Sequence, residues 1–355
     1  MEYRQLGHSG LRVSSLTLGT MTFGGQGKFA LVGNTELDAA KAQIDLCMEA
    51  GVNFYDTADV YSEGLSEKIL GQALKPYRDQ ALIATKARFP MGKEPNQAGA
   101  SRYHLINACE ASLKRLDTDH IDLYQIHEWD GVTPIEETLE AMDNLVRSGK
   151  IRYYGVSNYT GWQLMKTLGS AAQNHYLRPI TQQIHYTLQA REAEYELLPI
   201  AQDQDVGVLV WSPLAGGLLS GKYRRNHQSP EGSRHLQGWT EPPVYDVDKL
   251  YDIVDVLVDI AKQKEVSAAQ VSLAWLLSKP KVSSVIIGAR TDKQLQDNLQ
   301  AANLVLTQED IEKLDKVSRP PLLYPYWHQA TTASERLSSI DQHLLQPYID
   351  EMENQ

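Results

Sequence analysis

The sequence predicts an α/β protein in which residues 1–355 form a single (β/α)8 barrel of the TIM type. Eight short strand patterns alternate with helix patterns along the chain, which is the number of units that such a barrel contains. Most of the strand patterns are continuous apolar runs, as expected for strands that are covered on both faces. Ionisable side chains follow three successive strands, and chemistry collects at such strand ends in barrels. A doubly wound open sheet is the alternative fold.

The chain begins with the pattern of a β-hairpin within residues 1–15. Two short strand-like segments, Tyr3–Leu6 and Leu11–Val13, flank His8-Ser9-Gly10, which is a turn signal. We expect this hairpin to close the bottom of the barrel.

The alternation starts after the hairpin and continues to about residue 302. Strands are predicted near residues 16–18, 52–56, 81–85, 121–126, 151–156, 180–184, 206–211 and 282–287. Helices are predicted near residues 36–50, 65–74, 102–116, 134–147, 160–171, 193–204, 248–264, 267–278 and 291–302.

Several helix starts carry capping signals. Thr133-Pro134 predicts an N-cap threonine followed by proline at the first helical position. Thr160, Ser267 and Thr291 each precede a glutamine by three residues, which is the spacing of a capping box. These signals support the division into βα units.

Three segments are longer than a bare barrel needs. The loops at about 88–101 and 212–245 are rich in glycine and proline, and loops of such length are usually functional lids or partly disordered. The segment 319–355 carries Tyr324, Tyr326 and Trp327 close together, so we expect a C-terminal extension that packs over the barrel mouth. These three aromatic residues would then form part of the pocket wall.

Composition limits the possible partners and compartment. The chain is 42% hydrophobic and 22% charged, and its net charge of -11 argues against nucleic acid as a partner. No apolar run reaches the roughly 18–20 residues of a membrane span, and the first residues lack the layout of a signal peptide. Cys47 and Cys109 fall on apolar helix faces, so we expect buried thiols in a reducing, cytoplasmic setting. No metal-binding motif is present, so we expect no metal.

Four side chains gather at the ends of the second, third and fourth barrel strands. Asp56 follows the run Val52–Tyr55, and Tyr61 lies on the loop beyond it. Lys86 ends the next strand and His127 ends the one after that. Each residue alone has an ordinary structural explanation, but together they would place a carboxylate, an ammonium, an imidazole and a phenol at one edge of the barrel.

These residues, within the motifs Asp-Thr-Ala-Asp-Val-Tyr, Ala-Thr-Lys and Gln-Ile-His, resemble the catalytic tetrad of the aldo-keto reductases. The resemblance extends from about residue 3 to 306 and favours the branch that includes potassium-channel β-subunits. It implies that Tyr61 is the general acid and that Lys86 lowers the tyrosine pKa. Asp56 would hold Lys86, and His127 would orient the carbonyl oxygen.

The resemblance also implies an NADP(H) site. Ser157, Asn158 and Gln183 would bind the nicotinamide carboxamide, and Trp211 would stack on the ring where relatives often have tyrosine. A glycine-rich segment after Trp211 resembles the pyrophosphate loop, and Arg290 resembles the residue that contacts the 2′-phosphate. There is no GxGxxG fingerprint, which disfavours a Rossmann site. The predicted cofactor-binding set is Gly19, Thr20, Met21, Asp56, Ser157, Asn158, Gln183, Trp211, Ser212, Pro213, Leu214, Gly217, Ser220, Lys222, Gly288, Arg290, Gln294 and Asn298.

The expected activity is reduction of a small aldehyde or ketone, with Phe23, Tyr61, His127 and Trp129 against the substrate. Two alternatives remain open: a cofactor-binding regulatory subunit with little turnover, and a barrel lyase that uses Lys86 as a Schiff base. The sequence leaves the substrate and the oligomeric state undetermined.

Overall fold

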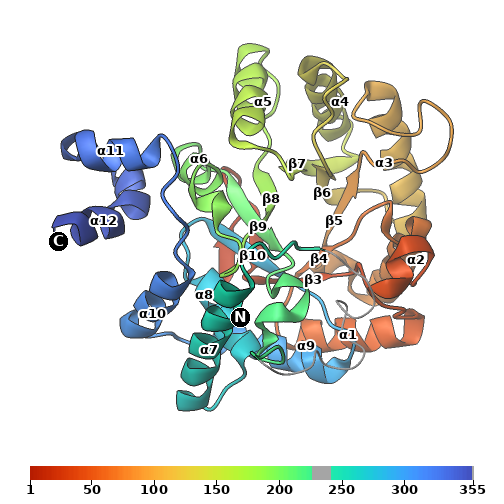
Figure 1. The fold of residues 1–355 in the computed structure, drawn as a ribbon. Coiled ribbons are helices and arrows are strands. Elements are labelled where there is room, and N and C mark those ends of the chain that lie inside the picture. The colour runs from red at the N-terminus through yellow and green to blue at the C-terminus, as the bar shows by residue number, and fades with distance from the viewer. Residues whose placement is uncertain (226–240, 354–355) are drawn as a thin grey trace.

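The computed structural model describes residues 1–225 and 241–353, and its centre is a closed barrel of parallel strands surrounded by helices (Figure 1). The strands follow one another around the barrel in the order β10-β3-β4-β5-β6-β7-β8-β9, so neighbours in the chain are neighbours in the sheet. The predicted (β/α)8 barrel is confirmed, and the open sheet is excluded because β10 pairs with β3.

Barrel strands lie where the apolar runs predict them, within two residues at each end. They are β3 (Leu16–Gly19), β4 (Phe54–Asp56), β5 (Leu82–Ala87), β6 (Ile121–Ile126), β7 (Ile151–Ser157), β8 (Thr181–His185), β9 (Gly207–Trp211) and β10 (Val282–Ile287). Nearly every residue of these strands is buried, because helices cover the outer face and side chains fill the inside.

The predicted helices are also present. They are α1 (Leu37–Glu49), α2 (Leu65–Leu74), α3 (Arg102–Leu116), α4 (Ile135–Arg147), α5 (Gly161–Gln173), α6 (Leu197–Asp203), α7 (Val247–Gln263), α8 (Ala268–Leu277) and α9 (Asp292–Leu299). Helix α6 is shorter than predicted because the segment before it forms a separate 3₁₀ turn, Glu192–Glu194.

Three further helices follow, which the sequence analysis does not predict: α10 (Gln308–Ser318), α11 (Tyr326–Thr332) and α12 (Ser339–Glu353). A signal for α10 was available, because Thr307 and Asp310 form a capping box in which each side chain bonds the other's backbone nitrogen.

An N-terminal hairpin closes the bottom of the barrel, as predicted. Strands β1 (Tyr3–Gln5) and β2 (Arg12–Ser14) pair antiparallel. Leu6 and Val13 are fully buried and pack against barrel residues such as Phe54 and Leu209. The hairpin therefore excludes water from the end of the barrel opposite the strand ends that carry the candidate site.

The predicted helix caps are confirmed in part. Thr160 forms a full capping box with Gln163, and Ser267 and Thr291 each accept a hydrogen bond from the backbone nitrogen three residues later. The prediction for Thr133 is wrong. Its hydroxyl donates to Asp130 Oδ2 at 2.7 Å, and Pro134 occupies the cap position instead.

The C-terminal extension does not cover the barrel mouth, which corrects the prediction from its aromatic residues. Helices α11 and α12 lie outside the barrel beyond α6 (Figure 1). Tyr326 stacks on Tyr195 with 5.2 Å between the ring centroids, and its hydroxyl donates to the Tyr195 backbone oxygen. Tyr324 and Trp327 are 75% and 48% exposed, so they face solvent rather than the pocket.

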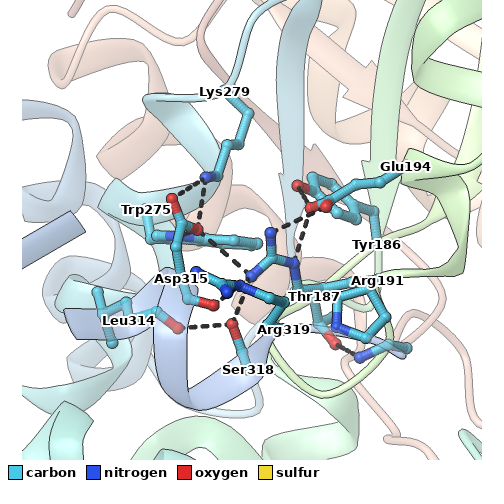
Figure 2. Close-up of polar contacts among 12 residues, drawn as sticks. Tyr186, Thr187, Arg191, Glu194, Trp275, Lys279, Leu314, Asp315, Ser318 and Arg319 are labelled. Atoms are coloured by element: carbon cyan, nitrogen blue, oxygen red, sulfur yellow. Dashed lines mark hydrogen bonds and ion pairs between the residues drawn. The ribbon is translucent and has the colours of Figure 1, made fainter. Parts of the chain in front are cut away.

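A polar network fastens the loop after β8 to α8 and α10 (Figure 2). The Arg191 guanidinium donates to both carboxylate oxygens of Glu194 at 2.8 Å and to the backbone oxygen of Asp315 at 3.0 Å. The Asp315 carboxylate in turn accepts from Lys279 at 2.7 Å and from the Trp275 indole at 2.9 Å. The network fixes the segment from which the C-terminal extension departs.

Candidate active site

The carboxyl ends of β4, β5 and β6 bring the four predicted residues together. Residue pairing places Asp56 of β4 opposite Ala84 of β5, and Lys86 of β5 opposite Gln125 of β6. His127 follows β6 directly, and Tyr61 begins a 3₁₀ turn after β4. Asp56, Tyr61, Lys86 and His127 therefore form one cluster at the mouth of the barrel.

Lys86 is the centre of this cluster. Its side chain is completely buried, and Nζ lies 2.5 Å from Asp56 Oδ1, 2.8 Å from the Thr57 backbone oxygen and 3.5 Å from the Tyr61 hydroxyl. Burial alone lowers the pKa of an ammonium, but Asp56 and Tyr61 outweigh this and raise the pKa of Lys86. Lys86 therefore carries a fixed positive charge directly behind Tyr61.

Asp56 is held from its other side by two amides. Its Oδ2 accepts hydrogen bonds from Gln183 Nε2 at 2.9 Å and from Gln125 Nε2 at 3.3 Å. Both oxygens of the carboxylate are thus engaged, which fixes the direction in which it presents charge to Lys86.

The pKa of Tyr61 is shifted in the direction opposite to the one that the sequence predicts. Burial raises the pKa of Tyr61, and the opposing effect of Lys86 is the smaller one. The phenol is therefore protonated near neutral pH. The charge of Lys86 favours the phenolate over the phenol, but it only partly offsets the effect of burial.

His127 is electrically neutral in this setting. Burial lowers the pKa of His127 well below its usual value, and the charges of Lys86, Lys28 and Arg88 lower it further. Nδ1 is buried and has no hydrogen-bond partner among the residues that the structure describes. Because a buried N–H without an acceptor is costly, we assign the proton to Nε2.

These side chains border a cavity of about 960 Å³ at the carboxyl ends of the strands. Every residue predicted to bind a cofactor lines it: Gly19, Thr20, Met21, Asp56, Ser157, Asn158, Gln183, Trp211, Ser212, Pro213, Leu214, Gly217, Ser220, Lys222, Gly288, Arg290, Gln294 and Asn298. The fold collects residues from widely separated segments into one cavity, while their individual roles stay predictions.

The glycine-rich segment after β9 suits a phosphate. It forms the 3₁₀ turn Ala215–Ser220, in which Gly217 has φ +102, a conformation that favours glycine. A Cβ at Gly217 would meet nothing within 4 Å, so the backbone borders open space. Lys222 and Arg290 line the same cavity as the amino end of α9. Backbone groups, two cations and a helix start are the elements of an anion site.

Trp211 provides a flat wall in the middle of the cavity. Its Nε1 donates to Asn158 Oδ1 at 3.0 Å, and its ring lies 4.6 Å from the His185 ring. Asn158 Nδ2 donates to the His127 backbone oxygen at 3.1 Å. Trp211 is thus held in one orientation and can stack on a planar ring.

Two of the predicted substrate contacts are absent from the lining. Phe23 is completely buried in the hydrophobic core, and Trp129 packs edge-on against Tyr159 and Trp162. Neither residue lines the cavity, so this geometry does not favour the two predicted contacts. A position after a barrel strand does not by itself decide whether a side chain points inward.

Other residues take the places that Phe23 and Trp129 were expected to fill: Lys28, Phe29, Phe89 and Glu128. Glu128 adjoins His127 in the chain, and Phe89 stands three residues after Lys86, so proximity to the tetrad in sequence could have indicated them. Lys28 and Phe29 lie in the 3₁₀ turn Gly27–Leu31, which the sequence analysis leaves as a loop.

Neither a metal site nor a membrane span is found within residues 1–225 and 241–353. No three His, Cys, Asp or Glu side chains in this part of the chain are grouped so that they could hold a metal ion. The described helices also lack the combination of length and apolarity that crossing a membrane requires.

Comparison with known proteins gives consistent matches. The model of the Aldo/keto reductase family matches residues 15–319. The uncharacterized oxidoreductase YrpG of Bacillus subtilis (strain 168) is 37% identical over 333 residues, covering 90% of this chain and 97% of its own.

Two other relatives differ in their described roles. A probable voltage-gated potassium channel subunit beta of Arabidopsis thaliana is 37% identical over 325 residues, covering 89% of this chain and 96% of its own. Versiconal hemiacetal acetate reductase of Aspergillus parasiticus is 34% identical over 346 residues, covering 92% and 99%.

Proposed function

Because the chain belongs to the aldo/keto reductase family, we propose that it reduces an aldehyde or ketone to an alcohol with NADPH, using Tyr61 as the general acid. The general class, an oxidoreductase acting on carbonyl compounds, follows from the family, from the related oxidoreductase of Bacillus subtilis and from the related reductase of Aspergillus parasiticus. The role of Tyr61 as general acid is supported by one observation: Tyr61 and His127 lie on the cavity wall, with the buried Lys86–Asp56 pair behind them.

The nicotinamide cofactor, when bound, supplies the hydride. Trp211 would support its ring, and the backbone around Gly217 would approach its phosphates. Lys222 and Arg290 would add positive charge for a further phosphate, and this favours NADPH over NADH.

Tyr61 and His127 would hold the carbonyl oxygen between the phenol and the imidazole Nε2. As the carbonyl carbon gains a C–H bond from the hydride, the π electron pair of the carbonyl moves to oxygen. That oxygen takes the phenol proton, and Tyr61 regains a proton from solvent. The charge of Lys86, 3.5 Å from the hydroxyl, stabilises the transient phenolate.

The buried position of Lys86 weighs against a Schiff-base lyase. Its Nζ is enclosed by Asp56, Thr57 and Tyr61, and Lys86 is not among the residues that line the cavity. A substrate carbonyl would have to displace Tyr61 before it could reach this nitrogen.

The test is consumption of NADPH and of NADH with a panel of activated aldehydes, comparing wild type with Tyr61→Phe. We expect a preference for NADPH and a loss of turnover of about 10²–10⁴-fold in the variant, with cofactor binding unchanged. Tyr103→Phe is the matched control, since this tyrosine is 64% exposed on α3.

A second function has some support, because several relatives are described as potassium channel β-subunits. If the wild type binds NADPH but reduces no aldehyde in the panel, the proposal of a reductase fails. A cofactor-binding regulatory subunit would then be favoured, and the next experiment would be capture of a channel-like partner.

A further inference from the structure

The outer part of the cavity has a composition that indicates the kind of carbonyl compound it accepts. Lys28, Phe29, Phe89 and Glu128 line this part, next to Tyr61 and His127 rather than to the glycine-rich loop. These four side chains therefore surround whatever group is attached to a bound carbonyl carbon.

Two phenyl rings flank the groups proposed to hold the carbonyl oxygen. The Phe29 ring lies 5.3 Å from the Tyr61 ring at an interplanar angle of 63°, and the Phe89 ring lies 4.7 Å from the His127 ring at 63°. A flat apolar group attached to the carbonyl carbon would meet both rings. Aromatic groups gain most from such surroundings, through edge-to-face and offset contacts.

An ammonium group stands at the outer end of the same space. Lys28 Nζ is 5.2 Å from the centroid of the Phe29 ring and 5.9 Å from the centroid of the Phe89 ring. The two rings therefore border the same part of the cavity, next to the ammonium group. Cation–π contacts of this kind hold the ammonium over the rings without neutralising it. Lys28 is exposed, and it has no ion pair with any carboxylate in the described part of the chain.

Two cations, Lys28 and Arg88, lie against the phenyl rings of this space. Arg88 lies behind Phe89, with 5.6 Å between the guanidinium carbon and the ring centroid. Burial lowers the pKa of His127, and both Lys28 and Arg88 lower it further, so their field reaches the carbonyl end of the site.

Two acidic side chains adjoin this region. Burial raises the pKa of Glu128, and Arg88 opposes that shift. The Glu63 carboxylate lies beside Gly27, the residue before Lys28.

We propose that the preferred substrate is an aryl aldehyde that carries a carboxylate, with its ring between Phe29 and Phe89 and its carboxylate on Lys28. This inference rests on the proposed reductase function. The reduction itself is the step described above, and the carboxylate takes no part in it. Lys28 therefore contributes to substrate binding and selection, not to the proton or hydride transfer.

The test compares 4-carboxybenzaldehyde with its neutral methyl ester, methyl 4-formylbenzoate, and with benzaldehyde. In Lys28→Met, we expect KM for 4-carboxybenzaldehyde to rise roughly three- to fivefold, the upper part of the range for one exposed charge pair. KM for the two neutral aldehydes should stay within about twofold of the wild-type value. Lys28→Arg, which keeps the positive charge, should retain most of the preference for 4-carboxybenzaldehyde. Lys166→Met, a change at an exposed lysine on α5, is the charge-matched control.

A binding measurement separates this inference from the reductase proposal. Calorimetric titration of the alcohol product, 4-(hydroxymethyl)benzoate, into the NADP⁺-loaded protein should show weaker binding in Lys28→Met and in high salt. Equal effects of Lys28→Met on the acid and its ester, or no preference of the wild type for the acid, would overturn the inference while leaving the reductase in place. Absence of turnover with all three aldehydes would instead count against the reductase.

Discussion

Single residues in this barrel show how burial and pairing decide chemical behaviour. Lys86 and Asp56 are both buried, yet the ammonium keeps its charge because the carboxylate lies 2.5 Å away. A buried pair of this kind costs free energy to desolvate and contributes little net stability. Its value here lies in placing a fixed charge behind Tyr61, so function explains its presence better than folding does.

Asp59 is a buried carboxyl that the proposed mechanism does not use. It is completely buried, and neither of its oxygens has a hydrogen-bond partner among the residues described. Burial raises the pKa of Asp59 well above its usual value, and nearby Glu67 raises it further. The folded protein therefore keeps this proton at pH values where the unfolded chain releases it.

The raised pKa of Asp59 makes the free energy of unfolding depend on pH. Above the unfolded pKa of Asp59, stability falls as pH rises, because only the unfolded chain gives up the proton. We therefore expect the free energy of unfolding of Asp59→Asn, relative to wild type, to be roughly 1–4 kcal/mol higher at pH 7 than at pH 4, since each pH unit counts about 1.4 kcal/mol and the amide releases no proton. Urea denaturation at both pH values measures this. Asp38→Asn, on the exposed face of α1, is the control, and a gain of equal size at the two pH values would refute the explanation.

Among the structural elements, the turn Ala215–Ser220 has a backbone conformation on which the proposed cofactor binding depends. Gly217 has φ +102 beside open space, so alanine would meet no clash there but would be strained. We expect Gly217→Ala to weaken NADPH binding about five- to tenfold, as the loop relieves roughly 1 kcal/mol of strain by moving.

Fluorescence titration with NADPH measures that change. Gly10→Ala is the matched control, because a Cβ at Gly10 also meets nothing within 4 Å but its φ is not in the left-handed region. Unchanged affinity in Gly217→Ala would mean that the loop backbone does not approach the cofactor.

The polar network around Arg191 should contribute to the free energy of unfolding (Figure 2). Arg191→Met would leave Glu194 and Asp315 without their shared cation in a largely buried place. We expect a loss of about 3–5 kcal/mol in the free energy of unfolding, which is usual when one partner of a buried pair is removed.

The same substitution at an exposed site provides the comparison. Arg225→Met removes contacts to Asp248 and Asp252 at the surface, where we expect a loss of at most about 1 kcal/mol. Urea denaturation of both variants at neutral pH measures the difference. Similar losses in the two variants would show that the Arg191 network is not effectively buried.

At the scale of the whole molecule, the C-terminal extension is a separate layer on the outside of the barrel. Ala330, Leu344, Leu345 and Ile349 form their own small cluster, which packs on Tyr195 near α6. None of the extension's described residues, which end at Glu353, lines the cavity. The extension therefore covers part of the outer surface and does not form a lid.

A truncation tests this assignment. Deletion of residues 320–355 should leave relative kcat/KM values across a panel of aldehydes unchanged within about twofold, while lowering the melting temperature by several degrees. The physical reason is loss of apolar burial on Tyr195 and α6 without any change in the lining of the cavity. A marked change in aldehyde preference would restore the idea of a lid.

The barrel and the cluster of Asp56, Tyr61, Lys86 and His127 could both be predicted from the amino-acid sequence. Apolar runs mark buried parallel strands because both of their faces must be covered, and the parallel order then brings all strand ends to one edge. Both conclusions depend on local pattern and chain order, which the sequence contains in full.

The tertiary structure alone decided which loop side chains face the cavity and where the C-terminal extension lies. Phe23 turned into the core and Trp129 packed on Tyr159, while Phe29 and Phe89 took the places beside Tyr61 and His127. The net pKa of Tyr61 was also a tertiary result, because burial by distant segments outweighs one neighbouring charge. Such outcomes depend on packing between segments far apart in the chain, and local pattern does not specify that packing.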